Sequence, residues 1–440
     1  FYNFSSMAQS GTESTRGYSR SSTGLGAGST RRSVSSMSTT SLSLQHAINI
    51  DGNKPAVVIE IGAQLTKIGF AGEFSPRNII RTEYMDESLI VQRDLFDGVD
   101  ETKRSSLSRL FHFFKHIYFT HLLTVPRERR VVIIESLLAP SHIRRAITVV
   151  VLEMMEAPSI LFAPSHLMAT LPFNTNTALV VDLGWTEACS MPIAEGITML
   201  SQWEAVGKGA KAVIRRLREL LERDGLVEDV DGSRRPLSQG DWHVIDDAKL
   251  LEDILVRGLF VTRMSRADSL GVGEKPEPEP SEIVLPMGTE MLVVPGYVRE
   301  LAAEVLFDSK SEDEPGLHEM IHNIVARCPL DLRRKLFSRL LIVGGLAHLP
   351  GLLPRLKAEI VRLGEIRKLK TTDSVGFYIL EKCRMESWMA WLGGSMFGSL
   401  SDTLTHRSLT REDWIENRKL SDSIHWNDPF EKAGLVKARS

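Results

Sequence analysis

One pattern occurs twice in this chain and restricts the folds that it can adopt. AVVIEIGAQLTKIGFAG covers residues 56–72, and ALVVDLGWTEACSMPIAEG covers residues 178–196. In each segment an apolar run reaches a carboxylate two residues before a glycine, and a second apolar run follows. This order predicts a β-hairpin with a short glycine-containing turn. Two such hairpins far apart in one chain indicate two related halves.

The segments around the hairpins alternate between strand and helix patterns. After the strand-like RRVVIIES, SHIRRAITVVVLEMMEA predicts a helix with Ser141 as its N-cap. SRLLIVGGLAHLPGLLPRLKAEIVRL predicts a strand, a double glycine and an amphipathic helix. The side chains expected to face inward from that helix are Leu352, Leu353, Leu356, Ile360 and Leu363. The alternation predicts an α/β fold class, in which helices cover sheets.

Composition excludes several classes of protein. Apolar residues make up 42% of the chain and charged residues 25%, with a net charge of -3, so we expect no nucleic-acid partner. The longest apolar runs contain charges and are shorter than the roughly 18 to 20 residues of a membrane span, so none is expected. Three cysteines without a CxxC pair argue against a disulfide framework or a cysteine zinc site.

The N-terminal region has a different composition. Between residues 8 and 43, 18 of the 36 positions are Ser or Thr. Such a segment buries too little apolar surface to offset its ordering entropy, so we expect residues 1–50 to be a disordered tail. A mitochondrial transit peptide is the alternative, because Arg is frequent here and acids are rare. Met7 is a candidate start residue.

The hairpins suggest a phosphate site. Turn N–H groups form concave sites for anions, and two facing hairpins would hold a polyphosphate from both sides. Glu60 and Asp182 would hold Mg²⁺ through water, and Lys67 would neutralise phosphate. Gly344 and Gly345 would let the chain pass close to a nucleoside phosphate. Taken singly, these features equally fit a capped turn, a solvated lysine and a helix–strand packing contact.

The order of these motifs resembles the actin family. The resemblance rests on IGAQLTKIGFAGEFSPR from Ile61, LVVDLGWTEACSMPIAEG from Leu179, LIVGGLAHLPGLLPRL from Leu341 and AWLGGSMFGSLSD from Ala390. It implies an actin-like ATPase fold, with two related α/β domains around a nucleotide cleft. The expected parts are a tail (1–50), a first half (54–177) with a reduced outer subdomain (about 82–105), a second half (178–400) and a C-terminal segment (401–440) that packs back on the first half.

The resemblance also implies a binding site for ATP or ADP with Mg²⁺. The cofactor-binding residues would be Gly62, Lys67, Asp182, Gly184, Gly344 and Gly345, and the metal would be held through water by Glu60 and Asp182. The turns depart from the family pattern. Glu60 stands in place of an aspartate, Ala63 and Gln64 replace a serine and a glycine, and Trp185 and Thr186 replace an aspartate and a glycine.

Turnover of the nucleotide is not expected. Where the family has a glutamine and a histidine that position the attacking water, this chain has Ser165, with His166 beside it, and Cys189. Neither Ser165 nor Cys189 replaces the reach of the lost groups, so we predict no catalytic residue and a pseudo-ATPase. We expect Cys189 to be a small buried residue on the returning strand. Leu255 and Ser387 fall near adenine-contacting positions.

Within the actin family, the resemblance is to the divergent subunit at the pointed end of dynactin. Only 40 residues separate Arg77 from Tyr118, fewer than in actin, so the loop that docks on the next subunit would be shortened. This implies a cytoplasmic, cytoskeletal subunit that caps the filament, anchors other pointed-end subunits and serves dynein-based transport with its cargo adaptors. The alternatives are an active ATPase or kinase of the same superfamily and a nuclear chromatin-remodelling subunit.

Overall fold

The computed structural model describes residues 54–86, 91–96, 98–99, 102–271, 273, 276–309, 314–379 and 386–420. These residues all belong to one compact unit, Ala47–Ser440. The predictions for the N-terminal tail and for Met7 lie outside the described residues. No helix in the described part of the chain is both long enough and apolar enough to cross a bilayer.

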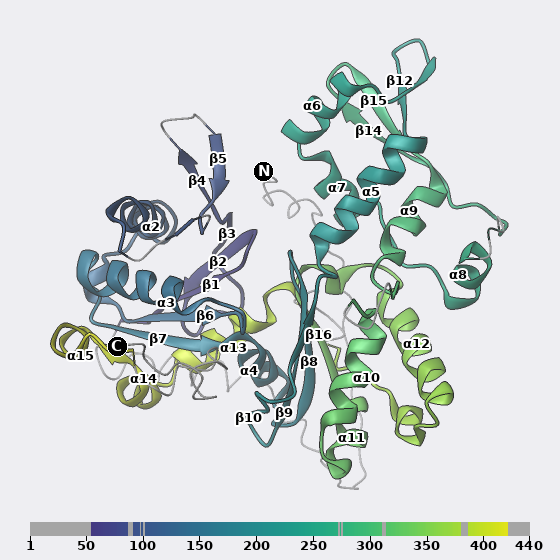
Figure 1. Cartoon of the computed structure of the whole chain (residues 1–440). Helices are drawn as coiled ribbons and strands as arrows, with labels where there is room; N and C mark the ends of the chain where they lie inside the picture. The colour runs from purple at the N-terminus through teal and green to yellow at the C-terminus, as the bar shows by residue number, and fades with distance from the viewer. Residues whose placement is uncertain are drawn as a thin grey trace, which may run out of the picture. The chain divides into compact units, whose positions relative to one another are not determined.

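The first predicted hairpin lies in a sheet of six strands. Their order is β17-β7-β6-β1-β2-β3. Figure 1 shows the run from β7 to β3. The strands are β1 (Val57–Ile61), β2 (Leu65–Phe70), β3 (Asn78–Arg81), β6 (Val131–Glu135), β7 (Ser159–Pro164) and β17 (Leu409–Thr410). β1 pairs antiparallel with β2 and parallel with β6. Because it is covered on both sides, β1 begins with three fully buried apolar residues.

The second predicted hairpin has the same surroundings. β8 (Ala178–Leu183) pairs antiparallel with β9 (Ala188–Ala194) and parallel with β16 (Leu340–Val343). The two short strands β10 (Ile197–Thr198) and β11 (Glu204–Val206) each pair antiparallel with β9. In register, Asp182 lies opposite Cys189, just as Glu60 lies opposite Lys67. The two hairpins therefore present corresponding pairs of side chains, as expected for a repeated unit.

Two smaller sheets complete the strands within the described residues. One has the order β13-β12-β15-β14 and the other pairs β4 with β5. Their bounds are β4 (Glu83–Asp86), β5 (Val91–Asp94), β12 (Leu226–Glu228), β13 (Arg234–Pro236), β14 (Ile283–Met287) and β15 (Glu290–Val294). The β4–β5 hairpin is the only strand pair that the structure describes between β3 and α2, in the stretch where a reduced outer subdomain is expected.

The helices cover the sheets. They are α2 (Arg104–His116), α3 (Ser141–Thr148), α4 (Ser165–Thr170), α5 (Ala210–Asp224), α6 (Gln239–Asp247), α7 (Leu250–Arg257), α8 (Met264–Gly271), α9 (Gly296–Glu304), α10 (Leu317–Arg327), α11 (Leu330–Phe337), α12 (Leu352–Ile366), α13 (Met389–Gly398), α14 (Ser401–Arg407) and α15 (Arg411–Asn417). α10 packs on β9 and on α12, and α13 returns to pack on α4 (Figure 1). α2 and α3 continue as the π-helical turns η1 (Ile117–Leu122) and η3 (Val149–Met154).

The N-cap prediction for α3 is wrong. Pro140 is the N-cap and makes no side-chain capping bond, and Ser141 is the first helical residue. Pro140 has φ -65° and ψ 144°, an extended conformation that its ring favours, so the helix starts one residue later than its serine suggests.

The inward face predicted for α12 is only partly correct. Leu352, Leu356 and Ile360 are buried, but Leu353 and Leu363 are half-buried. Their place in the core is taken by Arg355 and Glu359, which are charged residues four positions apart that form an ion pair. A hydrophobic pattern assigns charged residues to the solvent-facing side of a helix. Arg355 and Glu359 can be buried because each compensates the charge of the other, and the pattern does not show this pairing.

The double glycine in α13 allows close helix packing. A Cβ on Gly393 would lie 1.8 Å from the carbonyl oxygen of Met168 in α4. Near it, Trp391 Nε1 donates to the Val58 oxygen at 3.1 Å. The following β17 pairs with β7 at the edge of the first sheet. The C-terminal helices are thus fixed to the sheet that holds the first hairpin.

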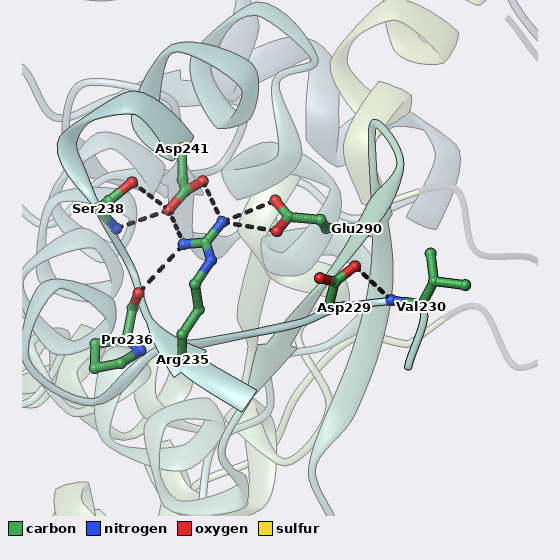
Figure 2. A network of polar contacts seen from close by, with 7 residues as sticks. All are labelled: Asp229, Val230, Arg235, Pro236, Ser238, Asp241 and Glu290. Atoms are coloured by element: carbon green, nitrogen blue, oxygen red, sulfur yellow. Dashed lines mark hydrogen bonds and ion pairs between the residues drawn. The ribbon is translucent and has the colours of Figure 1, made fainter. Parts of the chain in front are cut away.

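The β12–β13 hairpin is anchored at its base by one arginine. Figure 2 shows Arg235 between the carboxylates of Asp241 and Glu290, with nitrogen–oxygen distances of 2.7 to 3.0 Å. Asp241 also accepts the backbone N–H of Ser238 at 2.7 Å in the capping box of α6. The Arg235 guanidinium holds the pKa of the Asp241 carboxyl well below its usual range. The hairpin, α6 and β15 are therefore joined through one guanidinium.

Candidate functional site

The two hairpins border one cavity of about 750 Å³. Its lining includes every residue that the sequence predicted to bind nucleotide or metal: Glu60, Gly62, Lys67, Asp182, Gly184, Gly344 and Gly345. Leu255 and Ser387, the residues expected near an adenine, line it as well. Residues from distant segments of the sequence thus line one cavity.

Glu60 and Lys67 form an ion pair across the first hairpin. They occupy opposite positions on β1 and β2, and Lys67 Nζ donates to Glu60 Oε1. Burial raises the pKa of the Glu60 carboxyl, Lys67 opposes this, and Asp182 adds to it. The other carboxylate oxygen, Glu60 Oε2, is buried and has no hydrogen-bond partner among the described residues. It is an unsatisfied acceptor beside the cavity, which a water molecule or a hydrated cation would satisfy.

Asp182 lies against the glycine doublet. Gly344 has φ +95°, and a Cβ there would lie 2.5 Å from Asp182 Oδ1 and 2.4 Å from the Leu183 oxygen. Only glycine fits this left-handed position so close to another strand. Gly345, by contrast, has nothing within 4 Å of a Cβ. Of the two glycines, only Gly344 is therefore required for steric reasons. The lack of a side chain there lets the loop after β16 lie against the end of β8.

The hairpin turns leave part of their backbone available. Gly62 N–H donates to the Leu65 oxygen at 3.1 Å, and Gly184 N–H donates to the Glu187 oxygen at 3.0 Å, so both glycine donors are used within the turns. In the part of the chain that the structure describes, the N–H groups of Ala63 and Gln64 donate to no backbone oxygen. Gln64 Oε1 is also buried without a partner. The first turn retains the donors that an anion needs.

Two further ion pairs, which the sequence did not predict, also border the cavity. Arg144 donates to Glu135 in a buried pair, and Arg81 donates to Glu252 at 2.7 Å. Burial raises the pKa of Glu135, and Arg144 opposes the shift. One signal was present in the sequence: Glu135 ends a run of apolar residues, as Glu60 nearly does. Because these cations already have carboxylate partners, they add little free positive charge to the site.

The residues at the places expected to position water contact one another. Ser165 Oγ lies 3.3 Å from His166 Nδ1, and His166 Nε2 lies 3.3 Å from the Cys189 backbone oxygen. All three residues are buried, and only Cys189 lines the cavity. Burial lowers the pKa of His166 and raises that of the Cys189 thiol, so both are neutral near pH 7. The prediction of a buried Cys189 on the returning strand is confirmed.

These residues fit a nucleotide with a hydrated magnesium ion. The unsatisfied Glu60 Oε2 and the nearby Asp182 are hard oxygen ligands of the kind that Mg²⁺ contacts through water. Within the described residues there is no group of three or more His, Cys, Asp or Glu side chains that would ligate a metal directly. The donor set therefore suits an ion that keeps its water shell and shares its charge with phosphate.

Comparison with known proteins places the chain in a family. The family model described as Actin matches residues 105–424. Actin-related protein 10 from Dictyostelium discoideum is 24% identical over 418 residues, covering 82% of this chain and 86% of the relative. Putative actin-29 from the same organism is 22% identical, with coverage of 83% and 95%. The SWI/SNF and RSC complexes subunit arp42 from Schizosaccharomyces pombe is 22% identical, with coverage of 82% and 96%.

The family match and the fold agree. The match covers more than half of the chain and includes the second hairpin and the glycine doublet. The mixed α/β sheets are those of an actin-like fold. This chain belongs to the actin family.

Proposed function

We propose that this chain is a structural, actin-like subunit that retains ATP or ADP with Mg²⁺ without turning it over. The observation that carries the proposal is the meeting of both hairpins and the glycine loop at one cavity, beside an unsatisfied carboxylate oxygen. Gly62, Lys67, Asp182, Gly184, Gly344 and Gly345 would contact the nucleotide, and Glu60 and Asp182 would hold the ion through water. A bound magnesium ion would neutralise phosphate charge that the paired cations leave uncompensated.

Three features support retention without turnover. Ser165 and Cys189 stand where the family positions water, and the Ser165 hydroxyl contacts His166 instead of the cavity. The Cys189 thiol is held neutral by burial, so it is a poor base. Lys67 is already paired with Glu60, so its charge is divided between that carboxylate and any phosphate. None of these residues would therefore orient the attacking water.

The division of the chain forms part of the proposal. We infer a first half (54–177) and a second half (178–400) that derive from one repeated unit, with residues 401–440 returning to the first. In support, β1 and β8 each have an antiparallel hairpin partner and a parallel neighbour, and β17 pairs with β7. The reduced outer subdomain would correspond to the β4–β5 hairpin.

The assembly that we propose is dynactin. A shortened outer subdomain would remove the docking loop toward a further subunit, while the opposite surface could still join a filament. The chain would thus cap the pointed end, anchor other pointed-end subunits in the cytoplasm and act indirectly with dynein and cargo adaptors. The similarity to Actin-related protein 10 agrees with this choice. The similarity to arp42 supports the nuclear chromatin-remodelling alternative.

Affinity purification separates the two assemblies. The tagged full chain would be expressed in its own source cells, captured separately from cytosolic and nuclear extracts, and its partners identified by mass spectrometry. We expect dynactin subunits in stoichiometric amounts from the cytosol. Recovery of chromatin-remodelling subunits from the nucleus, without dynactin, would replace this assembly with the alternative.

Asp182→Ala should remove most of the stabilisation that Mg-ATP gives the protein. A ligand at one hundred times its Kd stabilises the native state by about 2.7 kcal/mol. The variant lacks the carboxylate that lies at the end of β8 beside Gly344. The measurement is the melting temperature with and without Mg-ATP, and Asp331→Ala on the exposed start of α11 is the control. Equal ligand-induced shifts in both variants would contradict this role for Asp182.

A further inference from the structure

Two histidines meet where α2 passes into a π-helical turn. His116 is the last residue of α2, and His121 lies in η1. A π-helix bonds each residue to the fifth one along, so residues five apart come to lie above one another. His116 and His121 have this spacing. The change of helix type therefore brings together two side chains that a continuous α-helix would separate around its circumference.

The two imidazoles face each other through the same ring nitrogen. His116 Nε2 and His121 Nε2 are 3.1 Å apart and share a hydrogen bond whose donor depends on the tautomer, so a metal ion would take the place of the shared proton. The rings are nearly perpendicular, with centroids 4.7 Å apart. Zinc binds histidine nitrogen at about 2.0 to 2.1 Å, so two such ligands stand roughly 3.3 Å apart in a tetrahedral site. In a square-planar copper or nickel site the separation is roughly 2.9 Å. The observed distance lies between these values.

The pair is accessible to an ion with its water. His116 is exposed and His121 is partly exposed, so hydrated ligands can complete the coordination sphere. Neither histidine lines the large cavity.

We propose that His116 and His121 form a two-histidine site for a borderline divalent transition-metal ion such as Zn²⁺, Ni²⁺ or Cu²⁺, with water at the other positions. Imidazole suits these ions and does not suit Mg²⁺. With only two protein ligands the site is weak compared with structural zinc sites, which use four. Binding joins the end of α2 to η1 and fixes the π-helical turn. The site is independent of the nucleotide proposal.

Titration of the metal-free full chain with ZnCl₂ in the presence of Mg²⁺ tests the proposal. Isothermal titration calorimetry on the wild type should show one zinc ion bound per chain at this site. His116→Gln and His121→Gln should each weaken that binding at least tenfold. His112→Gln, an exposed histidine one turn earlier on α2, is the matched control and should bind like the wild type. Circular dichroism checks that all four proteins are folded.

Three results would overturn the assignment. They are an absence of zinc binding to the folded wild type below millimolar concentration, unchanged affinity in either of the two variants, and an equal loss in His112→Gln. A repeat with CuCl₂ tests the class of metal, because an imidazole site should bind Cu²⁺ more tightly than Zn²⁺. The reverse order would also contradict a simple two-histidine site.

Discussion

Gly344→Ala should lower the free energy of unfolding by about 3 kcal/mol or more, whereas Gly345→Ala should change it by less than about 1 kcal/mol. At Gly344 the new Cβ would sit 2.4 Å from the Leu183 oxygen, in a backbone conformation with φ +95°. A side chain there strains the backbone and pushes β16 away from β8. At Gly345 a Cβ meets no atom within 4 Å.

Urea unfolding measures the free energy of unfolding of the two variants. We expect a large loss for Gly344→Ala and a small change for the adjacent Gly345→Ala. If both substitutions cost the same, the doublet would be acting through chain flexibility and the close approach of Gly344 to Asp182 would not matter. A second consequence follows for the site, because Gly344 and Asp182 both line the cavity. Gly344→Ala should also reduce the stabilisation of the folded protein by Mg-ATP.

Arg355→Met should cost about 3 to 5 kcal/mol of stability, the range for breaking a buried ion pair. Arg355 is 5% exposed and donates to both oxygens of Glu304, at 3.0 and 2.9 Å, and to Glu359 at 2.8 Å. The variant leaves the half-buried Glu304 without its cation, and it leaves the buried Glu359 paired with Arg362 alone. Lys357→Met, an exposed change on the same helix, is the control and should stay within about 0.5 kcal/mol of the wild type.

The loss caused by Arg355→Met should depend on pH. Burial raises the pKa of Glu304, and Arg355 counteracts this rise. Without the arginine, the folded-state pKa moves further above the unfolded value, so the carboxyl binds a proton more tightly in the folded state. The variant should therefore lose stability as pH rises through that folded-state pKa, and its deficit should be larger at pH 8 than at pH 5. A deficit independent of pH would indicate lost packing on Phe307, whose ring lies 4.6 Å from the guanidinium carbon.

Local sequence patterns predicted the parts of this fold that depend on backbone geometry. The hairpins at Gly62 and Gly184 were predictable because alternating apolar strands and glycine turns are local signals. The burial of Arg355 and Glu359 was not, because a paired charge in the core looks like a solvent-facing one in sequence. The N-cap of α3 was misassigned because Pro140 and Ser141 both favour a helix start.

At the candidate site, sequence predicted which residues meet but not how they are engaged. The order of motifs identified Glu60, Lys67 and Asp182, and all three line one cavity. The ion pair between Glu60 and Lys67 needs the strand register, which is a tertiary property. The contact of His166 with the Cys189 backbone oxygen likewise depends on how α4 lies beside β9.

The central claim is that the chain holds nucleotide without hydrolysing it, and a single-turnover measurement tests it most directly. Purified protein would be loaded with Mg²⁺ and ATP labelled at the γ-phosphate, freed of unbound nucleotide, and sampled over hours for bound ATP and released phosphate. Asp182→Ala would show the background from contaminating ATPases. We predict bound, intact ATP in the wild type and little retention in the variant. Phosphate release from the wild type at the rate of a working actin-family ATPase, or no retained nucleotide at all, would contradict the account.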